Sequence, residues 1–210
     1  QAQLTALQAQ ISPHFLYNTL ENIRWKVIEL CRGDNEASQM ILKLSELLRI
    51  SLDDADQIIS IEQEVRNTRL YVDILQLRYE SKLEVQWNIP EEVQKCAIVK
   101  VSLQPLIENA VYHGIKPKRE KGIIQVYAEK DSEKLKVTIQ DDGIGMDPEE
   151  CRILNEDLRN NFQFKKGHIG VRNVNQRLKL LLGDQAQMKV TSEKGKGTCV
   201  QMALPYREVE

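Results

Sequence analysis

The sequence is poor in the residues that usually indicate a metal centre, a disulfide framework or a membrane span. It holds four cysteines, which lie far apart and form no Cys-x-x-Cys pair. Their spacing predicts reduced, mostly buried thiols in a cytosolic setting rather than metal ligands or disulfide partners. No apolar run approaches the roughly 20 residues that cross a bilayer, and no stretch has the pattern of a signal peptide. The cysteines are Cys31, Cys96, Cys151 and Cys199.

The sequence also lacks an excess of either charge. Lysine and arginine total 29 and aspartate and glutamate total 31, which gives a net charge of −2 with both signs spread along the chain. This balance does not indicate nucleic acid as a partner. Hydrophobic residues at 41% and charged residues at 29% are typical of a globular chain with one large domain or two small ones. Because the chain starts with Gln, within a helical pattern, we expect it to be a piece of a longer protein.

Glycine is absent from residues 1–31, and this segment is predicted to form a helix. Alternating steps of three and four residues define a seam along it, apolar at both ends and polar in the middle. A second apolar stripe predicts another buried side. Pro13 suits either a helix start or a kink; we expect one kinked helix, because residues 1–11 already have a helical pattern. The seam is Leu4, Leu7, Ile11, His14, Asn18, Glu21, Trp25 and Ile28, and the second stripe is Leu16, Leu20, Ile23, Val27 and Leu30.

A turn at residues 32–35 leads into a second predicted helix that ends near Asp53, with Gly33 as the expected C′ residue of the first helix. Two antiparallel helices bury too little surface by themselves. We therefore expect a four-helix bundle formed by two copies of the chain, with two-fold symmetry. The polar run 53–57 predicts a domain boundary, which assigns residues 1–58 to the helical domain and 59–210 to a second domain.

The second domain alternates between helical and extended patterns. Strands and helices interleave with hairpins, so its predicted fold is a two-layer α/β sandwich with a mixed sheet. A short helix is expected after Asp147, because Pro148 suits a first helical turn. The predicted longer helices are 61–81, 101–114 and 170–182, and the predicted strands are 83–89, 122–128, 134–141, 188–192 and 198–204.

His14 is one of only three histidines, and it lies in the polar middle of the seam. On a helix, Tyr17, Asn18 and Glu21 share its face. A neutral imidazole is a competent nucleophile near neutral pH, because its unperturbed pKa is about 6.5. A plain surface histidine would also satisfy this pattern. The string Pro-His-Phe-Leu-Tyr-Asn at residues 13–18, however, resembles the phosphoacceptor segment of the LytS/YesM-type sensor histidine kinases of bacteria.

Four patches in the second domain have groups suited to a nucleotide. The carboxamide oxygen of Asn109 suits Mg²⁺, which takes few protein ligands and keeps several waters. Asp141, at a strand end, is able to accept from the exocyclic amine of adenine, and Gly143 allows the backbone to approach the base. Gly-His-Ile-Gly at 167–170 precedes a helix whose free amides suit phosphate. Taken singly, a surface Asn, an Asp-Gly turn and a helix cap would explain these patches.

The fourth patch, residues 195–198, is not a phosphate loop, because the P-loop spacing is absent and a strand follows it. The order and separation of the four patches resemble the N, G1, G2 and G3 boxes of the GHKL, or Bergerat, ATP-binding fold. The resemblance implies that Asn109 binds Mg²⁺, that Asp141 binds the adenine amine and that Thr198 supports Asp141 through water. It implies a mobile lid at residues 147–166. The implied ATP-binding residues are Asn109, His113, Asp141, Gly143, Gly145, Met146, Gly167, His168, Ile169, Gly170, Val171 and Thr198.

Two positions depart from the pattern of the resembling kinases. Tyr112 stands where many of them have a basic residue, so Lys116 or Lys118 would have to replace its phosphate contact. Phe15 stands where many have an acid directly after the phosphoacceptor. Glu21 is therefore the expected acceptor of the imidazole proton.

Together the resemblances imply the core of a homodimeric sensor histidine kinase. His14 would take the γ-phosphoryl group of ATP–Mg²⁺ and pass it to an aspartate of a response regulator. The implied location is the cytoplasmic portion of a bacterial inner-membrane receptor, whose sensor and membrane spans would precede this segment. Asn18 is expected either to orient the water that dephosphorylates the regulator or to fix the register of the bundle.

Two other functions remain compatible with parts of the sequence. One is a GHKL ATPase that works as a conformational clamp. Pro105 argues against it, because the ATP hydrolases of this fold commonly have Glu at that place. The other is a non-catalytic dimeric adaptor, and the presence of all four boxes argues against that function.

Overall fold

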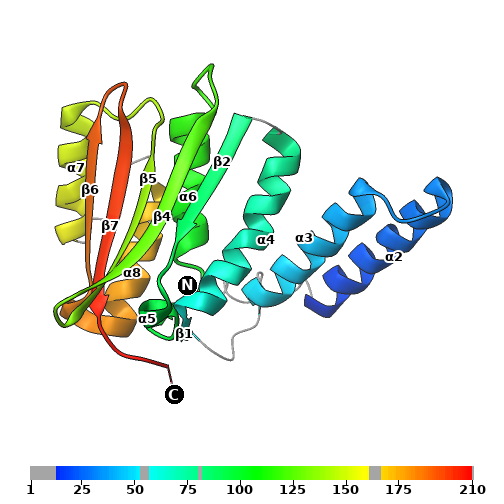
Figure 1. The fold of residues 1–210 in the computed structure, drawn as a ribbon, viewed down its shortest axis with the longest axis horizontal. Coiled ribbons are helices and arrows are strands. Elements are labelled where there is room, and N and C mark those ends of the chain that lie inside the picture. Colours follow the sequence, from blue (N-terminus) through cyan, green and yellow to red (C-terminus); the bar gives the residue numbers. More distant parts are fainter. Residues whose placement is uncertain (1–12, 53–56, 80–81, 161–166, 210) are drawn as a thin grey trace, which may run out of the picture.

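The computed structural model describes residues 13–52, 57–79, 82–160 and 167–209. A helical hairpin of α2 (Pro13–Cys31) and α3 (Glu36–Leu52) projects to one side of a larger α/β unit (Figure 1). Both predicted helices of the hairpin are confirmed over these bounds. The part of the first helix predicted before Pro13, and most of the predicted boundary at 53–57, lie outside the described residues.

A five-stranded mixed sheet forms the centre of the α/β unit. Its strand order is β2-β4-β5-β7-β6. The β2–β4 pair is parallel and the other three pairs are antiparallel, so the predicted mixed sheet is confirmed. The strands are β2 (Leu83–Asn88), β4 (Gly122–Asp131), β5 (Lys134–Asp141), β6 (Gln187–Glu193) and β7 (Gly197–Pro205).

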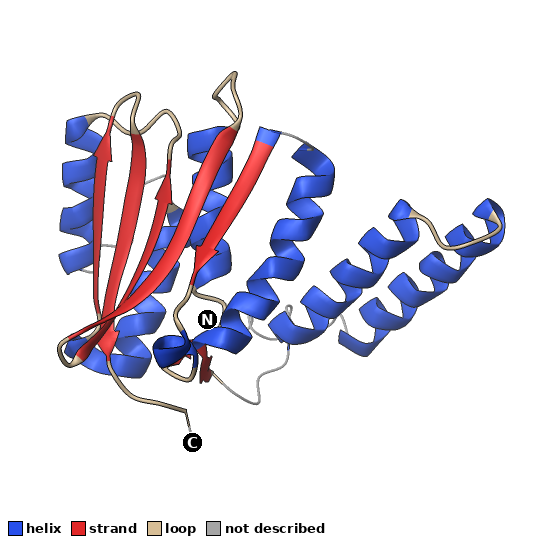
Figure 2. Ribbon diagram, viewed as in Figure 1, coloured by secondary structure: helices blue, strands red, loops and turns tan. Residues whose placement is uncertain are grey.

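Helices cover one face of this sheet, and the other face is turned toward the viewer in Figure 2. Alternation along the strands places Ile124, Val126 and Ala128 of β4 in the core, while Gln125 between them is exposed. Apolar positions at helical spacing, such as Val171, Val174 and Leu178 of one helix, meet them from the other layer. The helices are α4 (Ile61–Tyr79), α6 (Leu103–Asn109), α7 (Pro148–Asn160) and α8 (Ile169–Leu182), followed by a 3-10 turn at Gly183–Gln185.

A second, smaller sheet was not predicted. It pairs β1 (Ile58–Ser60) with β3 (Ala97–Val99), and a short helix α5 (Glu91–Gln94) precedes β3. The C-terminal segment adds to it, because the Ala97 amide donates to the Arg207 carbonyl at 2.7 Å. Strands of three residues are too short to show an alternation in sequence, and this explains why the pattern was missed.

Two further predictions need correction. The helix expected at 101–114 starts at Leu103 and continues past Asn109 as a π-helix, η2 (Ala110–Ile115). The mobile lid expected at 147–166 is largely a helix: α7 packs on the edge strand β6 with Leu154 and Leu158 buried. The short helix that the cap signals predicted is thus 13 residues long and belongs to the core.

The turn of the hairpin differs by one residue from the prediction. Arg32, rather than Gly33, has the left-handed conformation expected of a C′ residue, with φ 57°. The Gly33 amide closes the helix end by donating to the Ile28 carbonyl at 3.0 Å. At the start of α3, Asn35 and Ser38 exchange two hydrogen bonds in a capping-box arrangement.

The hairpin is thinly packed in a single chain. The Tyr17 hydroxyl of α2 donates to the Leu48 carbonyl of α3 at 3.2 Å, and Leu47 is buried. The second stripe was predicted to be buried, but in the single chain Ile23 is 46% and Leu30 is 80% exposed. Within the described residues, no helix combines the length and apolarity needed to cross a bilayer.

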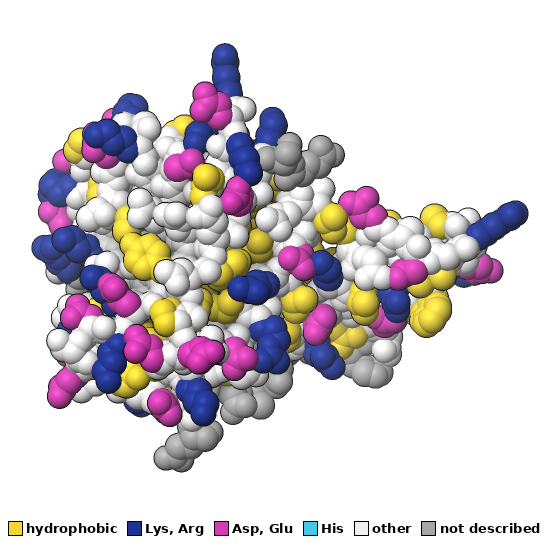
Figure 3. Space-filling model, viewed as in Figure 1, with side chains coloured by type: hydrophobic (Ala, Val, Ile, Leu, Met, Phe, Trp, Pro, Cys, Tyr) yellow, Lys and Arg dark blue, Asp and Glu magenta, His cyan; other side chains and the backbone are white. Residues whose placement is uncertain are grey.

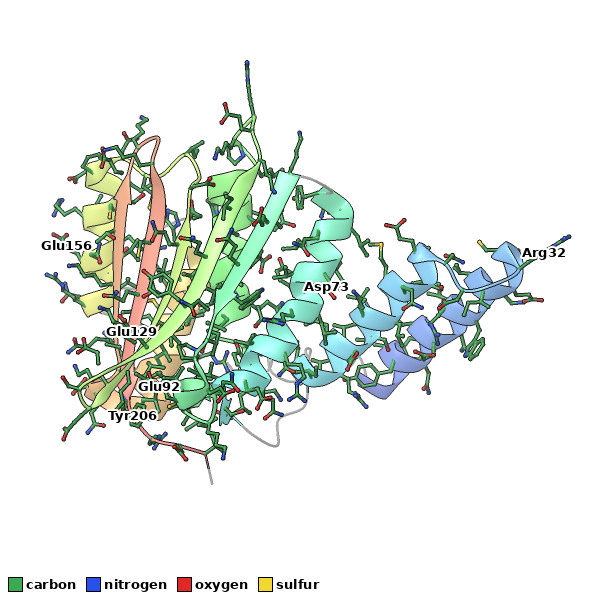
Figure 4. All side chains as sticks on the ribbon, in the orientation of Figure 1. Arg32, Asp73, Glu92, Glu129, Glu156 and Tyr206 are labelled. Carbon is green, nitrogen blue, oxygen red and sulfur yellow. The ribbon has the colours of Figure 1, made fainter. Side chains whose placement is uncertain are left out.

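The hairpin joins the α/β unit through contact between α3 and α4. The Lys43 ammonium lies 2.5 Å from a carboxylate oxygen of Asp73, which sits on the side of α4 that faces the hairpin (Figure 4). On the face of the molecule shown in Figure 3, positive and negative side chains are interspersed.

Candidate nucleotide site and phosphoacceptor helix

A pocket opens between the sheet and the helices α6, α7 and α8. Its walls are mostly apolar and carry a few polar groups, an arrangement typical of sites for small molecules. Eight of the predicted nucleotide-binding residues line it. The lining residues are Leu106, Asn109, Ala110, His113, Gly114, Ile139, Asp141, Gly145, Met146, Leu154, His168, Val171, Val190, Thr198 and Val200.

Asp141 is the buried charge of this pocket. It ends β5 and is only 5% exposed. Its Oδ1 accepts from the Gly143 amide at 2.8 Å and from the Thr198 amide at 3.3 Å. Burial raises the pKa of Asp141 to about 6, and these two amides act in the opposite direction. A buried carboxylate with a raised pKa in a cleft is a mark of a binding or catalytic site.

Two glycines make room around Asp141. A Cβ on Gly114 would lie 2.6 Å from Asp141 Oδ1, and a Cβ on Gly143 would collide with the Gly114 backbone. Side chains at these positions would therefore fill the space beside the carboxylate. The close neighbours of Gly143 are Gly114 and Asp141, and Gly143 is not among the residues that line the pocket, so its predicted approach to the base stays a prediction.

Thr198 supports Asp141 through its backbone amide, whereas the sequence suggested a water. Its side-chain hydroxyl instead pairs with the Ser192 hydroxyl, at 2.9 Å between the two oxygens. Ser192 also accepts from the Met146 amide at 2.8 Å, which links β6 to the loop that forms the pocket rim. Ser192 is a site-supporting residue that the sequence reasoning missed, because no motif contains it.

Asn109 faces the start of α8. Its Nδ2 donates to the Pro105 carbonyl one turn earlier, at 2.6 Å, and this bond fixes the orientation of the amide. The carboxamide oxygen is then the atom suited to bind a cation. Gly170 allows the Asn109 side chain to lie close to the start of α8, because a Cβ at Gly170 would collide with Asn109 Nδ2. The residues present thus fit Mg²⁺ bound through one protein oxygen, with phosphate and water as the other ligands.

The π-helical segment after Asn109 explains why the side chain four residues later lines the pocket and the one three residues later does not. A π-turn has more residues than an α-turn, and His113 lines the pocket while Tyr112 does not. The expected replacements for a basic residue also lie elsewhere. The Lys116 ammonium lies over the Tyr112 ring at 5.4 Å, and Lys118 forms an ion pair with Asp142 at 3.0 Å. Neither lysine is among the described residues that line the pocket.

A pair of histidines closes the other side of the pocket. The rings of His113 and His168 are 5.3 Å apart between centroids, and His168 Nε2 lies 2.9 Å from Glu150 Oε1. Burial lowers the pKa of His113, and the neighbouring His168 lowers it further, whereas Glu150 raises it. Lowering favours the neutral form of His113 at pH 7.

The N-terminus of α8 was predicted to hold phosphate. His168 precedes the helix with φ 50°, and Val171 of the first turn faces the pocket. Ile169, in contrast, is 66% exposed, and neither it nor Gly167 is among the lining residues. Arg172 donates to the Gly167 carbonyl and, at 2.8 Å, to buried Asp157 of α7, so it fixes this turn.

The predicted phosphoacceptor segment lies on helix α2 of the hairpin. His14 is in the first turn of the described part of α2, and its side chain is outside the described residues. Asn18 is exposed and Phe15 is 65% exposed. Glu21 Oε2 lies 3.5 Å from Arg24 Nη1, and its role as proton acceptor stays a prediction.

The fold is a mixed sheet covered on one face by helices, with a pocket beside the buried carboxylate of Asp141. Residues 98–208 match the family model for histidine kinase-, DNA gyrase B-, and HSP90-like ATPases. Residues 2–83 match the model for histidine kinases.

Two curated relatives are named sensor histidine kinases. The chain is 36% identical to the sensor histidine kinase YesM of Bacillus subtilis over 207 residues, which are 99% of this chain and 34% of that protein. It is 38% identical to YpdA of Escherichia coli over 185 residues, 87% of this chain and 31% of that protein. The chain thus spans about a third of the length of these relatives. The chain belongs to the family of histidine kinase-, DNA gyrase B-, and HSP90-like ATPases, and its N-terminal part matches the histidine kinase model.

Solved structures agree on the fold. The histidine kinase domain of a blue-light activated histidine kinase from Erythrobacter litoralis superposes with a TM-score of 0.53 at 21% identity, over 92% of this chain and 94% of that one. The catalytic domain of histidine kinase ThkA gives 0.52 at 15% identity, over 72% of this chain and 97% of that one.

Proposed function

We propose that this chain is the kinase core that transfers the γ-phosphoryl group of ATP to His14. The observation that carries the proposal is the combination of an adenine-type pocket around buried Asp141 with a phosphoacceptor string on the same chain. An unprotonated ring nitrogen of His14 attacks the γ-phosphorus in line. The new nitrogen–phosphorus bond forms as the bond to the bridging oxygen of ADP breaks. Positioning and neutralisation of charge supply most of the catalysis in such transfers.

The pocket residues divide the work of holding the nucleotide. Asp141 accepts from the adenine amine, and Gly145 and Met146 stand beside the base. Asn109 would hold Mg²⁺ through its carboxamide oxygen. When bound, that ion supplies positive charge to the phosphates. His168 and Val171, at the start of α8, lie where its positive dipole end and free amides favour phosphate.

The relatives support a proposal for the wider role. We infer that two chains pair through the hairpin and that phosphorylated His14 passes its phosphoryl group to an aspartate of a response regulator. YesM and LytS carry the word sensor in their names. A core that consumes ATP belongs on the cytoplasmic side, so we place it in the cytoplasmic portion of a bacterial membrane receptor.

Incubation with γ-labelled ATP tests the central step. Wild-type chain should acquire label that is lost in acid and kept in base, as expected of phosphohistidine. His14→Gln should acquire none, because the glutamine amide is not a nucleophile, and its ATP affinity by calorimetry should match that of the wild type. Acid-labile label in the variant would move the phosphoacceptor to His113 or His168 and refute the assignment.

A further inference from the structure

Helix α6 is capped by a residue from another helix. Its own N-cap residue, Ser102, makes no side-chain capping bond, because its hydroxyl donates to the Val99 carbonyl at 2.6 Å. Glu64 of α4 supplies the cap. Its Oε1 accepts from the Ser102 and Leu103 amides at 2.8 and 2.9 Å, and its Oε2 accepts from the Val101 amide at 2.9 Å.

This carboxylate is unusual in its burial. Glu64 is 1% exposed and accepts from three consecutive amides, of which Leu103 is the first residue of α6. A local Ser or Asp cap would stabilise α6 equally well at a smaller cost of desolvation. A cap from α4 does something that a local cap does not: it fixes where the helix starts relative to its neighbour.

Helix α8 holds the same loop from the other side. Arg177 Nη2 donates to the Lys100 carbonyl at 2.7 Å, and Nη1 donates to the Val101 carbonyl at 3.3 Å. Val101 has φ 56°, an uncommon conformation for a β-branched residue, which needs such support. The loop of Lys100, Val101 and Ser102 is thus clamped between Glu64 and Arg177.

The clamp and the nucleotide site lie at opposite ends of one helix pair. Arg177 is two turns beyond Gly170 on α8, and Gly170 is the residue that touches Asn109. Helices α6 and α8 therefore run antiparallel, with the clamp at the start of α6 and the Asn109–Gly170 contact at its end. Shifting α6 by a fraction of a turn would separate Asn109 from Gly170.

We propose that Glu64 and Arg177 are positioning residues for Mg²⁺–ATP binding, because they set the register of α6 along α8 and so place the Asn109 carboxamide. The proposal rests on the function assigned to Asn109 above. Helix α4 also contacts the hairpin through the pair of Asp73 and Lys43. The clamp therefore links the hairpin, through α4 and α6, to the end of the pocket where Asn109 lies.

Calorimetric titration of the full chain with ATP, once in Mg²⁺ and once in EDTA, tests the proposal. Glu64→Gln replaces the carboxylate with a carboxamide, which presents an NH₂ group and one weaker acceptor to the three amides of the loop. Because the loop is then held less firmly, the Mg²⁺–ATP dissociation constant should rise at least tenfold. The constant in EDTA should change less than threefold, because Asp141 is not part of the clamp. Arg177→Gln should give the same selective loss.

Two controls separate the possible failures. Glu62→Gln, two residues away on the exposed side of α4, should leave both constants unchanged. Asn109→Ala should remove the Mg²⁺ dependence; if it does not, the function assigned to Asn109 fails. If Asn109→Ala behaves as expected, three results would overturn the clamp proposal alone. Glu64→Gln and Arg177→Gln would lose ATP affinity equally with and without Mg²⁺, or they would lose none, or both variants would fail to fold. In the last case the clamp serves the fold only.

Discussion

Asp141 shows at the scale of one residue how a binding site costs stability. Its folded pKa of about 6 lies above the ordinary value of 3.8, because burial disfavours the ionised form. The folded state therefore holds this proton more tightly than the unfolded state, and stability falls as pH rises between these two values. Above pH 6 the whole cost is present, and only a ligand that donates to the carboxylate offsets it.

Asp141→Asn should therefore separate stability from function. At pH 8 the variant should be more stable than the wild type, by on the order of 2 kcal/mol in urea unfolding, because the buried charge is gone. Its ATP affinity should nevertheless fall, since the charge-assisted acceptor for the adenine amine is lost. A variant that is less stable and binds ATP as tightly as the wild type would show that the carboxylate serves the fold.

The same variant isolates the pH dependence of binding. When the pH falls from 7 to 5, most Asp141 becomes protonated, and the ATP dissociation constant of the wild type should rise about tenfold. Asp141→Asn should lack that part of the dependence. Comparing the two proteins in one titration removes the contributions from the nucleotide and from every other titrating group, because both proteins share them.

At the scale of elements, sequence reasoning was strongest where spacing alone identifies a motif. Asn109, Asp141 and Thr198 lie far apart in the sequence, yet strand and helix order places them around one pocket. The sequence did not predict the features that depend on tertiary packing. Nothing in the run from Ala110 to Ile115 distinguishes a π-turn from an α-turn, and the hydrophilic sequence of α7 conceals that Leu154 and Leu158 are buried.

The contact between α7 and the edge strand β6 is another feature that depends on tertiary packing. Asn155 of α7 takes the place of a neighbouring strand, because its Nδ2 donates to the Val190 carbonyl at 2.7 Å and its Oδ1 accepts from the Val190 amide at 3.0 Å. Covering an edge in this way also protects it from pairing with other chains. From sequence, an Asn in a polar helix gives no sign of this role.

Asn155→Ala should leave the Val190 amide without its partner, and the Val190 carbonyl with only the weak Cys151 thiol donor at 3.6 Å. We expect the free energy of unfolding in urea to fall by about 1–3 kcal/mol. Glu156→Ala is the matched control: Glu156 is exposed on the same helix (Figure 4) and pairs with Arg152 at the surface, so its loss should stay within about 0.5 kcal/mol. Equal effects of the two substitutions would show that the edge is held by other contacts.

At the scale of the whole molecule, the two parts of the chain differ in how completely each is packed. The α/β unit has a continuous core that joins both layers. The hairpin leaves large apolar side chains open along both helices, although its helices are well formed. A surface of this kind indicates a partner, and a second hairpin would complete a four-helix bundle. The exposed residues are Phe15, Ile23, Trp25, Leu30, Leu44 and Leu52.

Charge placed on this surface should therefore separate the dimer while leaving the nucleotide site intact. Ile23 and Leu30 lie two turns apart on one stripe of α2, so a chain with both Ile23→Asp and Leu30→Asp would bury four carboxylates in the bundle of two copies. Sedimentation over a range of concentrations should give a dimer for the wild type and a monomer for the double variant, with equal ATP affinity. Leu180→Asp is the control, because Leu180 is 75% exposed on α8, away from the hairpin. A double variant that stays dimeric, or a monomeric Leu180→Asp chain, would place the interface on another surface.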